Sequence, residues 1–125
     1  IGDIEYNEIN KLDFLTSRKM TLNELEWSKN ELSAIKSVFG ISNTRIVTEK
    51  FATESFIKNH NFSDVDILHL STHGIVDNQD YRNSSIVLNP DTENNGLLNF
   101  KEIEMLDLTN LELVFLSHQL NIQLD

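Results

Sequence analysis

The fold is decided by the stretch Val65-Asp66-Ile67-Leu68-His69-Leu70-Ser71-Thr72-His73-Gly74. Residues Val65–Leu70 are almost continuously apolar and have the length of a β-strand, and the run breaks at Ser71–Gly74. Strands of parallel sheets are covered on both faces and therefore show near-continuous apolar runs instead of strict alternation. The stretch predicts a buried, parallel strand that ends just before His73.

Downstream of this strand, the sequence alternates between extended and helical segments. Ser85–Leu88 predicts a short extended piece, and Asn99 predicts the N-cap of a helix over Phe100–Leu106. Leu111–Leu116 is a second apolar run of strand length, and it ends in Ser117-His118-Gln119. The two long apolar runs are thus separated by turns and a helix, as parallel strands require.

The residues upstream of Asp64 predict two helices and additional extended segments. A helical pattern begins near Thr21, with Thr21 or Asn23 as N-cap, and Gly40 marks its end. Three further segments are predicted: a strand end within Ile1–Tyr6, a strand over Ser42–Val47 and a helix over Thr53–His60. Strands that alternate with helices at this spacing are typical of a parallel sheet flanked by helices.

The sequence therefore predicts an α/β fold: a mostly parallel sheet of about four strands with helices on both faces. A chain of 125 residues fits a single domain. Parallel strands need a long crossover connection, yet only about nine residues follow Leu111–Leu116. We therefore expect residues 1–125 to form one partial domain whose sheet is cut short.

The composition argues against several classes of protein. Twenty acidic residues against ten basic ones give a net charge of −10, which repels nucleic acid and anionic lipid surfaces. The apolar runs are too short to span a bilayer, and no signal-peptide pattern is present. The absence of cysteine excludes disulfides, thiolate metal sites and a cysteine nucleophile. We expect a cytoplasmic protein that binds neither nucleic acid nor membrane and uses no cofactor.

Polar residues follow both apolar strands at the point where each is expected to end. His73 and Gly74 follow the first strand, and Ser117-His118-Gln119 follows the second. Catalytic groups in open parallel sheets gather beyond the carboxyl ends of the strands. A histidine there can act as a general base, and a glycine lets a backbone N–H approach an oxyanion closely. The arrangement predicts an acyl-transfer site.

Five segments occur in the order and at the spacing of one known family: Asp66–Gly74, Ser84–Leu88, Asn95–Leu98, Glu102–Ile103 and Leu113–Ser117. The helix around Glu31, which lies ahead of Phe39, and Gly2-Asp3 followed by Tyr6 extend the likeness towards the start of the chain. The chain resembles the CHAT domain, a caspase-like domain of the cysteine peptidase type that is usually found beside tetratricopeptide repeats. The likeness covers nearly the whole chain but only the first half of that domain.

The resemblance implies roles for three residues. It implies that His73 is the catalytic histidine and that the N–H of Gly74 helps to form the oxyanion hole. The family's nucleophile is the cysteine of a Leu-Ser-Ala-Cys stretch, and Gln119 stands at the position of that cysteine. A glutamine amide is neither nucleophilic nor titratable, so the activated thiolate has no counterpart. We expect a domain of the peptidase type that does not cleave peptides.

Three explanations of Gln119 remain open. The chain can be a naturally degenerate pseudo-enzyme, it can carry an altered or interrupted reading frame, or it can be a fragment whose tail differs from the native protein. Residues 119–125 contain none of the small residues that usually follow the family's cysteine. We favour loss of activity by degeneration or by truncation. The sequence does not distinguish between these two.

Some of these residues also have simpler interpretations. His69 lies inside the apolar run and is most simply a buried, hydrogen-bonded histidine. A metal site built from His69, His73 and His118 lacks the local spacing that such sites show, so no metal is expected. Ser117 beside His73 is a minor candidate for a serine nucleophile.

The rival interpretation of the whole chain is a non-catalytic interaction module. In that case the open sheet edge, or the edge of the sheet near His73, docks a peptide or protein partner such as a tetratricopeptide-repeat region. An open sheet edge invites strand pairing. We therefore predict self-association if the chain stops at Asp125.

Overall fold

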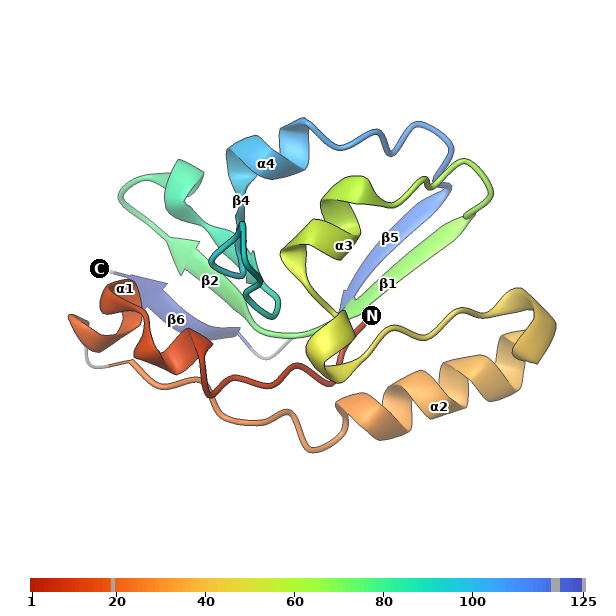
Figure 1. Cartoon of the computed structure of the whole chain (residues 1–125), viewed down its shortest axis with the longest axis horizontal. Helices are drawn as coiled ribbons and strands as arrows, with labels where there is room; N and C mark the ends of the chain where they lie inside the picture. Colours follow the sequence, from red (N-terminus) through yellow and green to blue (C-terminus); the bar gives the residue numbers. More distant parts are fainter. Residues whose placement is uncertain (19, 118–119, 125) are drawn as a thin grey trace.

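The computed structural model describes residues 1–18, 20–117 and 120–124 and has the expected α/β architecture (Figure 1). The helices are α1 (Asp13–Thr16), α2 (Ser28–Phe39), α3 (Glu54–Asn59) and α4 (Phe100–Glu104). The strands are β1 (Ile67–Ser71), β2 (Gly74–Asp77), β3 (Ser85–Val87), β4 (Leu97–Asn99), β5 (Leu113–Ser117) and β6 (Leu120–Leu124). Single turns of 3-10 helix lie at η1 (Ile9–Lys11), η2 (Ile41–Asn43), η3 (Glu49–Phe51) and η4 (Tyr81–Asn83).

The strands form two sheets, one of two strands and one of four. β1 pairs with β5 in parallel, with Ile67 opposite Leu113 and Ser71 opposite Ser117. In the four-stranded sheet the order is β4-β3-β2-β6, where β2 is parallel to β6 and antiparallel to β3. The predicted parallel pairing of the two long apolar runs is therefore confirmed. The antiparallel unit β2-β3-β4 and the strand β6 were not anticipated from the sequence.

Helices α2 and α3 cover opposite faces of β1. The hydroxyl of Ser71 donates a hydrogen bond to Glu31 of α2, whereas Leu68 and Leu70 belong to the same apolar core as Ile57 of α3. Successive side chains of a strand point to opposite faces of the sheet, so the two helices lie on different sides. Figure 1 shows β1 and β5 between them. The expectation of helices on both faces is confirmed for this pair of strands.

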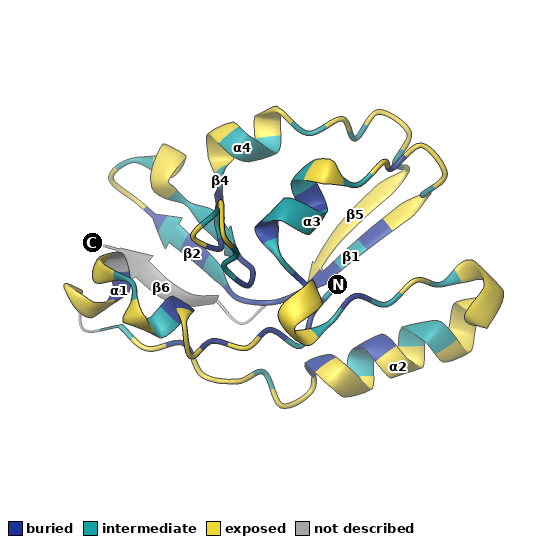
Figure 2. Ribbon diagram, in the orientation of Figure 1, coloured by how far each residue is buried: buried dark blue, intermediate teal, exposed yellow. Residues whose placement is uncertain are grey.

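The core lies on the α3 side of β1 and continues beneath β2, β3 and β4. Its buried apolar side chains come from the N-terminal segment, α1, α3 and all four of these strands, and they include Tyr6, Ile9, Leu15, Ile57, Leu70, Ile75, Val87 and Leu98. In Figure 2 the buried segments converge on the junction between β1 and β2. Residues Ser71, Thr72 and His73, which follow the first apolar run of the sequence, are therefore buried within the packed region.

Strand β5 is more exposed than its apolar sequence suggested. Residues Leu113, Val114, Phe115 and Leu116 are each 43–50% exposed (Figure 2). Parallel strands of this composition are normally buried on both faces. In the part of the chain that the structure describes, β5 pairs with β1 alone and is an edge strand, and the side chains on its two faces are only partly covered.

The helix expected from Thr21 begins later than predicted, at Ser28. The reason is a tertiary contact: Asn10 accepts a hydrogen bond from the N–H of Leu22 (2.8 Å) and donates one to its carbonyl oxygen (2.9 Å). These bonds occupy the backbone groups that a helix would use. Neither Thr21 nor Asn23 is an N-cap, whereas the predicted stop at Gly40 is confirmed.

The strand predicted over Ser42–Val47 is wrong. Ile41–Asn43 is a 3-10 turn, and the segment that follows is extended, with φ −129° and ψ 125° at Thr44. Its pairing among the described residues is a single parallel bridge from Thr48 to Gly2. An extended segment becomes a strand only when a neighbour pairs with it, and the sequence pattern does not reveal that neighbour.

The helices predicted over Thr53–His60 and Phe100–Leu106 are confirmed as α3 and α4, each somewhat shorter than predicted. The side chain of Thr53 caps α3 by accepting from the N–H of Phe56 (3.1 Å). Asn99 caps α4 in a reciprocal capping box with Glu102. No helix among residues 1–18, 20–117 and 120–124 is long and apolar enough to cross a membrane.

Candidate functional site

His73 lies at the junction between β1 and β2 and is completely buried. Its Nε2 atom is 2.6 Å from the carbonyl oxygen of Asn23. A carbonyl oxygen only accepts hydrogen bonds, so Nε2 carries a hydrogen atom, and Nδ1 is the basic nitrogen of the neutral ring. The edge of the ring also meets Tyr6, with the ring centroids 4.8 Å apart. The imidazole is therefore held in one orientation.

A chain of hydrogen bonds fixes the backbone on either side of His73. The Tyr6 hydroxyl accepts from the backbone N–H of His73 and lies 3.2 Å from the hydroxyl oxygen of Thr72. The Thr72 hydroxyl donates to the carbonyl oxygen of Val87 in β3, so the Tyr6 hydroxyl must be the donor to Thr72. Burial, the largest effect, raises the pKa of Tyr6 to about 12. We call Tyr6, Asn23, Thr72, His73 and Gly74 the His73 corner.

The backbone of Gly74 is oriented by its two neighbouring strands. Gly74 lies opposite Ile86 of β3 and is paired in parallel with Leu120 of β6. The N–H of Val87 donates to the carbonyl oxygen of His73 (2.9 Å), so Gly74 and Ile86 form a non-hydrogen-bonded antiparallel pair. The N–H of Gly74 therefore points away from β3, towards the side on which β6 pairs.

Gln119 and His118, which the sequence analysis placed at this site, lie outside the described residues. The residues on either side of them are described. Ser117 pairs with Ser71, its carbonyl oxygen accepts from the N–H of Thr72 (3.2 Å), and Leu120 pairs with Gly74. The parallel pairing thus brings the ends of β1 and β5 to the same edge, next to the His73 corner.

Glu31 forms a second polar cluster on the α2 side of the same strands. It accepts a hydrogen bond from the hydroxyl of Ser71 (2.6 Å) and one from the hydroxyl of Ser117. Its carboxylate also lies 3.4 Å from Nε2 of His69, whose ring stacks on Phe115. Burial favours a higher pKa for Glu31, but the hydroxyl donors and His69 outweigh it and lower the pKa.

This cluster changes the interpretation of two residues. His69 is half-buried, and its contact with Glu31 is at ion-pair distance but is too poorly aligned to be a hydrogen bond. Burial lowers the pKa of His69, and Glu31 partly opposes this effect. Ser117 directs its hydroxyl to Glu31. Sequence reasoning missed the cluster, although His69 and Ser71 are two apart on one strand and so had to share a face.

An open cleft of about 490 Å³ lies over this cluster. Its lining comes from the segment before α2, from α2 itself and from the ends of β1 and β5, and consists of Glu24, Leu25, Glu26, Trp27, Ser28, Glu31, Ser71 and Ser117. Within residues 1–18, 20–117 and 120–124, no group of three or more histidine or acidic side chains is arranged to hold a metal ion. The described residues at the ends of β1 and β5 offer an oriented imidazole, that of His73, and backbone N–H groups.

Comparisons with known proteins bear on these residues directly. The model of one family, described as the CHAT domain, matches residues 8–118, which include the His73 corner from Asn23 onward, the Glu31 cluster and both strands of the β1–β5 pair. The comparisons with curated proteins and with solved structures gave no match. The family match spans most of the 125 residues and includes His73 and Gly74, the histidine and glycine that the resemblance singled out. The chain belongs to the CHAT domain family.

Proposed function

We propose that this chain is a caspase-like CHAT domain of the cysteine peptidase type that does not cleave peptides. In this proposal His73 occupies the position of the general base, the N–H of Gly74 that of an oxyanion donor, and Gln119 that of the nucleophile. The observation that carries the proposal is the fixed, fully buried imidazole at the edge where β1 and β5 end. The 125 residues contain no cysteine that could supply a thiolate.

The surroundings of His73 are those expected of a general base in a site that lacks a nucleophile. A catalytic imidazole needs a partner that orients it, and the carbonyl oxygen of Asn23 provides one at 2.6 Å from Nε2. The machinery on the histidine side is therefore intact in this proposal, and the defect is confined to Gln119.

Restoring a thiol at residue 119 tests this assignment. We expect a Gln119→Cys variant to react with a thiol-directed peptide probe, and its thiol pKa to lie below the usual value of about 8.5 because an adjacent imidazolium stabilises the thiolate. The measurement is the rate of alkylation against pH. Ser63→Cys is the matched control, because Ser63 is exposed and lies away from the His73 corner.

The second variant needed is Gln119→Cys combined with His73→Ala. Its thiol pKa should return to that of the Ser63→Cys control, since the imidazole is gone. If Gln119→Cys alkylates with the same pH profile as Ser63→Cys, His73 does not face residue 119 and the proposed roles are wrong. Circular dichroism of each variant shows whether the fold is retained.

A second candidate function is favoured by the exposure of β5. Four consecutive apolar residues of this strand, Leu113–Leu116, are each 43–50% exposed, and an apolar edge strand is a template for strand pairing. In this alternative the chain is a non-catalytic interaction module that uses β5 to bind a protein partner, such as a tetratricopeptide-repeat region, or a second copy of itself.

Light scattering over a range of protein concentrations tests the second candidate. We expect the mean mass to rise with concentration, and a Val114→Lys variant to suppress the rise because a lysine charge on an edge strand opposes its pairing with another strand. Asn110→Lys adds the same charge at an exposed site outside the strand and serves as control. A chain that stays monomeric at high concentration would rule out self-association through β5.

A further inference from the structure

The last paired residues of β1 and β5 are both serines, and their hydroxyls donate to one carboxylate. Ser71 lies opposite Ser117 in the parallel pair. The Ser71 hydroxyl donates to Oε2 of Glu31 at 2.6 Å, and the Ser117 hydroxyl donates to the same carboxylate. Side chains alternate between the two faces of a sheet, so paired residues of neighbouring strands share a face, here the one that α2 covers. We call Glu31, Ser71 and Ser117 the Glu31 clamp.

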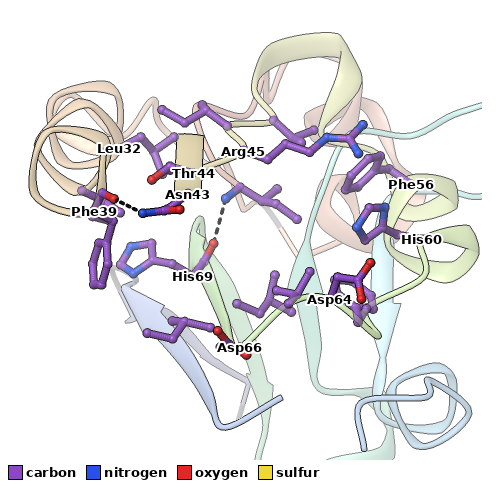
Figure 3. A pocket seen from close by; sticks show the side chains of 18 of the residues that line it. Leu32, Phe39, Asn43, Thr44, Arg45, Phe56, His60, Asp64, Asp66 and His69 are labelled. Atoms are coloured by element: carbon purple, nitrogen blue, oxygen red, sulfur yellow. Dashed lines mark hydrogen bonds between the residues drawn. The ribbon is translucent and has the colours of Figure 1, made fainter. Parts of the chain in front are cut away.

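The carboxylate of the clamp is itself held in place. Glu31 lies in the first turn of α2, where the buried hydroxyl of Ser28 donates to the carbonyl oxygen of Ser71 (3.2 Å). The second carboxylate oxygen of Glu31, Oε1, lies 3.4 Å from Nε2 of His69. Figure 3 shows the His69 side chain directed from β1 towards α2, at the border of an open groove of about 710 Å³. The first turn of α2 is therefore bonded to β1 through two side chains, Ser28 and Glu31.

The two strand ends depend on the Glu31 clamp to different degrees. After β1, His73 is fixed by the contacts of the His73 corner, which lie outside the clamp. At the end of β5, the carbonyl oxygen of Ser117 accepts from the N–H of Thr72 (3.2 Å), and its hydroxyl donates to Glu31. Among the described residues β5 pairs with β1 alone, so the bond to Glu31 is a large share of what holds this strand end.

A glutamate is closely matched to this contact. A carboxylate has two oxygens that only accept, so it can take a hydrogen bond from each serine at once. Bonds to a charged acceptor are also shorter and roughly twice as strong as neutral ones. A glutamine at position 31 would keep one such oxygen and replace the other by an amide donor, and an aspartate would be one methylene shorter. Neither close substitute reproduces the contact of Glu31 with both hydroxyls.

Each serine of the clamp precedes a position of the proposed site by two residues. His73 follows Ser71, and Gln119 follows Ser117 at the same spacing. We propose that Glu31 is a positioning residue that sets the distance between His73 and residue 119, an inference that rests on the proposed function. By accepting from both serine hydroxyls, Glu31 fixes where β5 ends relative to β1. A displacement of about 1 Å at a reacting group can change a rate about a hundredfold.

The first test follows the thiol of Gln119→Cys with and without Glu31→Gln. We expect Glu31→Gln to raise the thiol pKa towards its ordinary value of about 8.5 and to slow alkylation at pH 7 by about threefold or more, because the thiolate lies farther from the His73 imidazolium. Loss of charge alone predicts the opposite sign, since removing a nearby carboxylate lowers a thiol pKa. Glu26→Gln removes an exposed carboxylate from the lining of the same cleft and is the matched control, which should not raise the thiol pKa.

Ser117→Ala tests the same contact from its other partner. In the Gln119→Cys chain it should raise the thiol pKa by a similar amount, because it removes the hydroxyl that Glu31 binds. Combining it with Glu31→Gln should add little, since both changes break one interaction. Ser33→Ala removes an exposed serine hydroxyl of α2 and should leave the thiol pKa unchanged. Thermal unfolding shows that each variant is folded at the temperature of the alkylation.

A second measurement does not depend on the residue at position 119. The N–H of Thr72 bonds to the carbonyl oxygen of Ser117, so its amide exchange reports how firmly the end of β5 is held. In the chain that retains Gln119, Glu31→Gln and Ser117→Ala should each speed this exchange by about tenfold relative to exchange of the His73 N–H. The ratio of the two rates, measured by NMR, cancels any general loss of stability.

Three outcomes would overturn the proposal. A thiol pKa that is unchanged or lowered by Glu31→Gln would mean that Glu31 does not position residue 119. An unchanged ratio of Thr72 to His73 exchange would mean that the clamp does not hold the end of β5. Fully additive effects of Glu31→Gln and Ser117→Ala would mean that the two residues act independently.

Failure of the proposed function gives a different result. If Gln119→Cys alkylates like Ser63→Cys while Glu31 is still present, His73 does not face residue 119, and the distance that Glu31 is proposed to set has no catalytic meaning. The exchange ratio in the chain that retains Gln119 still decides, independently of that result, whether Glu31 holds the end of β5.

Discussion

The hydroxyl of Ser71 donates a 2.6 Å hydrogen bond to the carboxylate of Glu31 and so ties the end of β1 to helix α2 across 40 positions of the sequence. The hydroxyl of Ser117 donates to the same carboxylate, which brings the end of β5 into the contact. Glu31 therefore holds together the three elements that surround the edge where the catalytic position is proposed.

Replacing Glu31 by glutamine should lower the free energy of unfolding by about 1–2 kcal/mol, because the bonds from two hydroxyls to a charged acceptor are replaced by weaker bonds to a neutral amide. Urea denaturation followed by circular dichroism measures the effect. Glu26→Gln is the control, since Glu26 is an exposed glutamate in the preceding segment. Equal stabilities of the two variants would mean that the Glu31 contacts contribute nothing.

The effect of Glu31→Gln should also depend on pH. The pKa of Glu31 in the folded chain lies below its ordinary value of 4.5, because the hydroxyl donors outweigh the effect of burial. A lowered folded pKa gives stability that is fully present above about pH 4.5 and is lost as the pH falls through the folded pKa. The difference between the wild-type chain and Glu31→Gln should therefore shrink below pH 4.5. A difference that stays constant to pH 3 would contradict the assignment.

Lys58 balances the charge of a buried carboxylate, so replacing Lys58 should strongly destabilise the fold. Its Nζ atom is 2.6 Å from Glu54, which is 1% exposed, and 2.7 Å from Glu102. Removing one partner of a buried ion pair leaves an uncompensated charge, so Lys58→Met should cost about 2–4 kcal/mol. Lys11→Met removes the exposed pair with Glu8 and should cost less than about 1 kcal/mol.

Adding Glu54→Gln to Lys58→Met separates the two contributions. The double variant should recover part of the loss, because the stranded charge is gone and a neutral amide can still accept from the N–H of Gly96, which now bonds to Glu54 at 2.9 Å. Chemical denaturation of the three chains measures this. No recovery would mean that lost packing of the Lys58 side chain, not the charge of Glu54, causes the instability.

Two glycines with similar backbone angles should respond differently to alanine. Gly40 and Gly96 have φ of +84° and +86°, which penalises any side chain by about 1–3 kcal/mol. A Cβ at Gly40 meets nothing within 4 Å, whereas one at Gly96 lies 2.5 Å from the carbonyl oxygen of Leu88 and from Ile9. Gly96→Ala should therefore cost about 2 kcal/mol more than Gly40→Ala. Thermal unfolding of both variants checks this, and equal costs would contradict it.

Tyr6 should make the free energy of unfolding fall at alkaline pH. Burial, which dominates, raises the pKa of Tyr6 from 10.0 to about 12 in the folded chain, whereas an unfolded chain releases the proton near pH 10. Above pH 10 the unfolded state therefore binds fewer protons than the folded state, and stability falls as the pH rises towards 12. Tyr6→Phe should remove this dependence and cost about 1 kcal/mol at neutral pH through the lost bonds to Thr72 and His73. An unchanged alkaline profile in Tyr6→Phe would contradict the assignment.

The local elements were predictable where a short pattern decides them. The cap at Asn99 depends on a glutamate three positions later, and the end of α2 depends on a glycine that accepts a positive φ. The segments around Leu22 and Thr44 were mispredicted because their conformation is set by residues far away in the sequence. The side chain of Asn10 hydrogen-bonds the backbone of Leu22, and among the described residues the segment after Thr44 is bonded to Gly2 and Asp3.

By itself, the sequence determined the α/β class, the two parallel apolar strands, the position of His73 and Gly74 at a strand end, and the absence of a thiol. These features depend on composition and on patterns within about ten residues. Only the tertiary structure decided that Asn23 orients His73, that Glu31 joins Ser71 to Ser117, and that a groove lies open beside β1. Each of these contacts joins residues roughly 40 or more positions apart, and such contacts come from the packing of several elements at once, which no local pattern encodes.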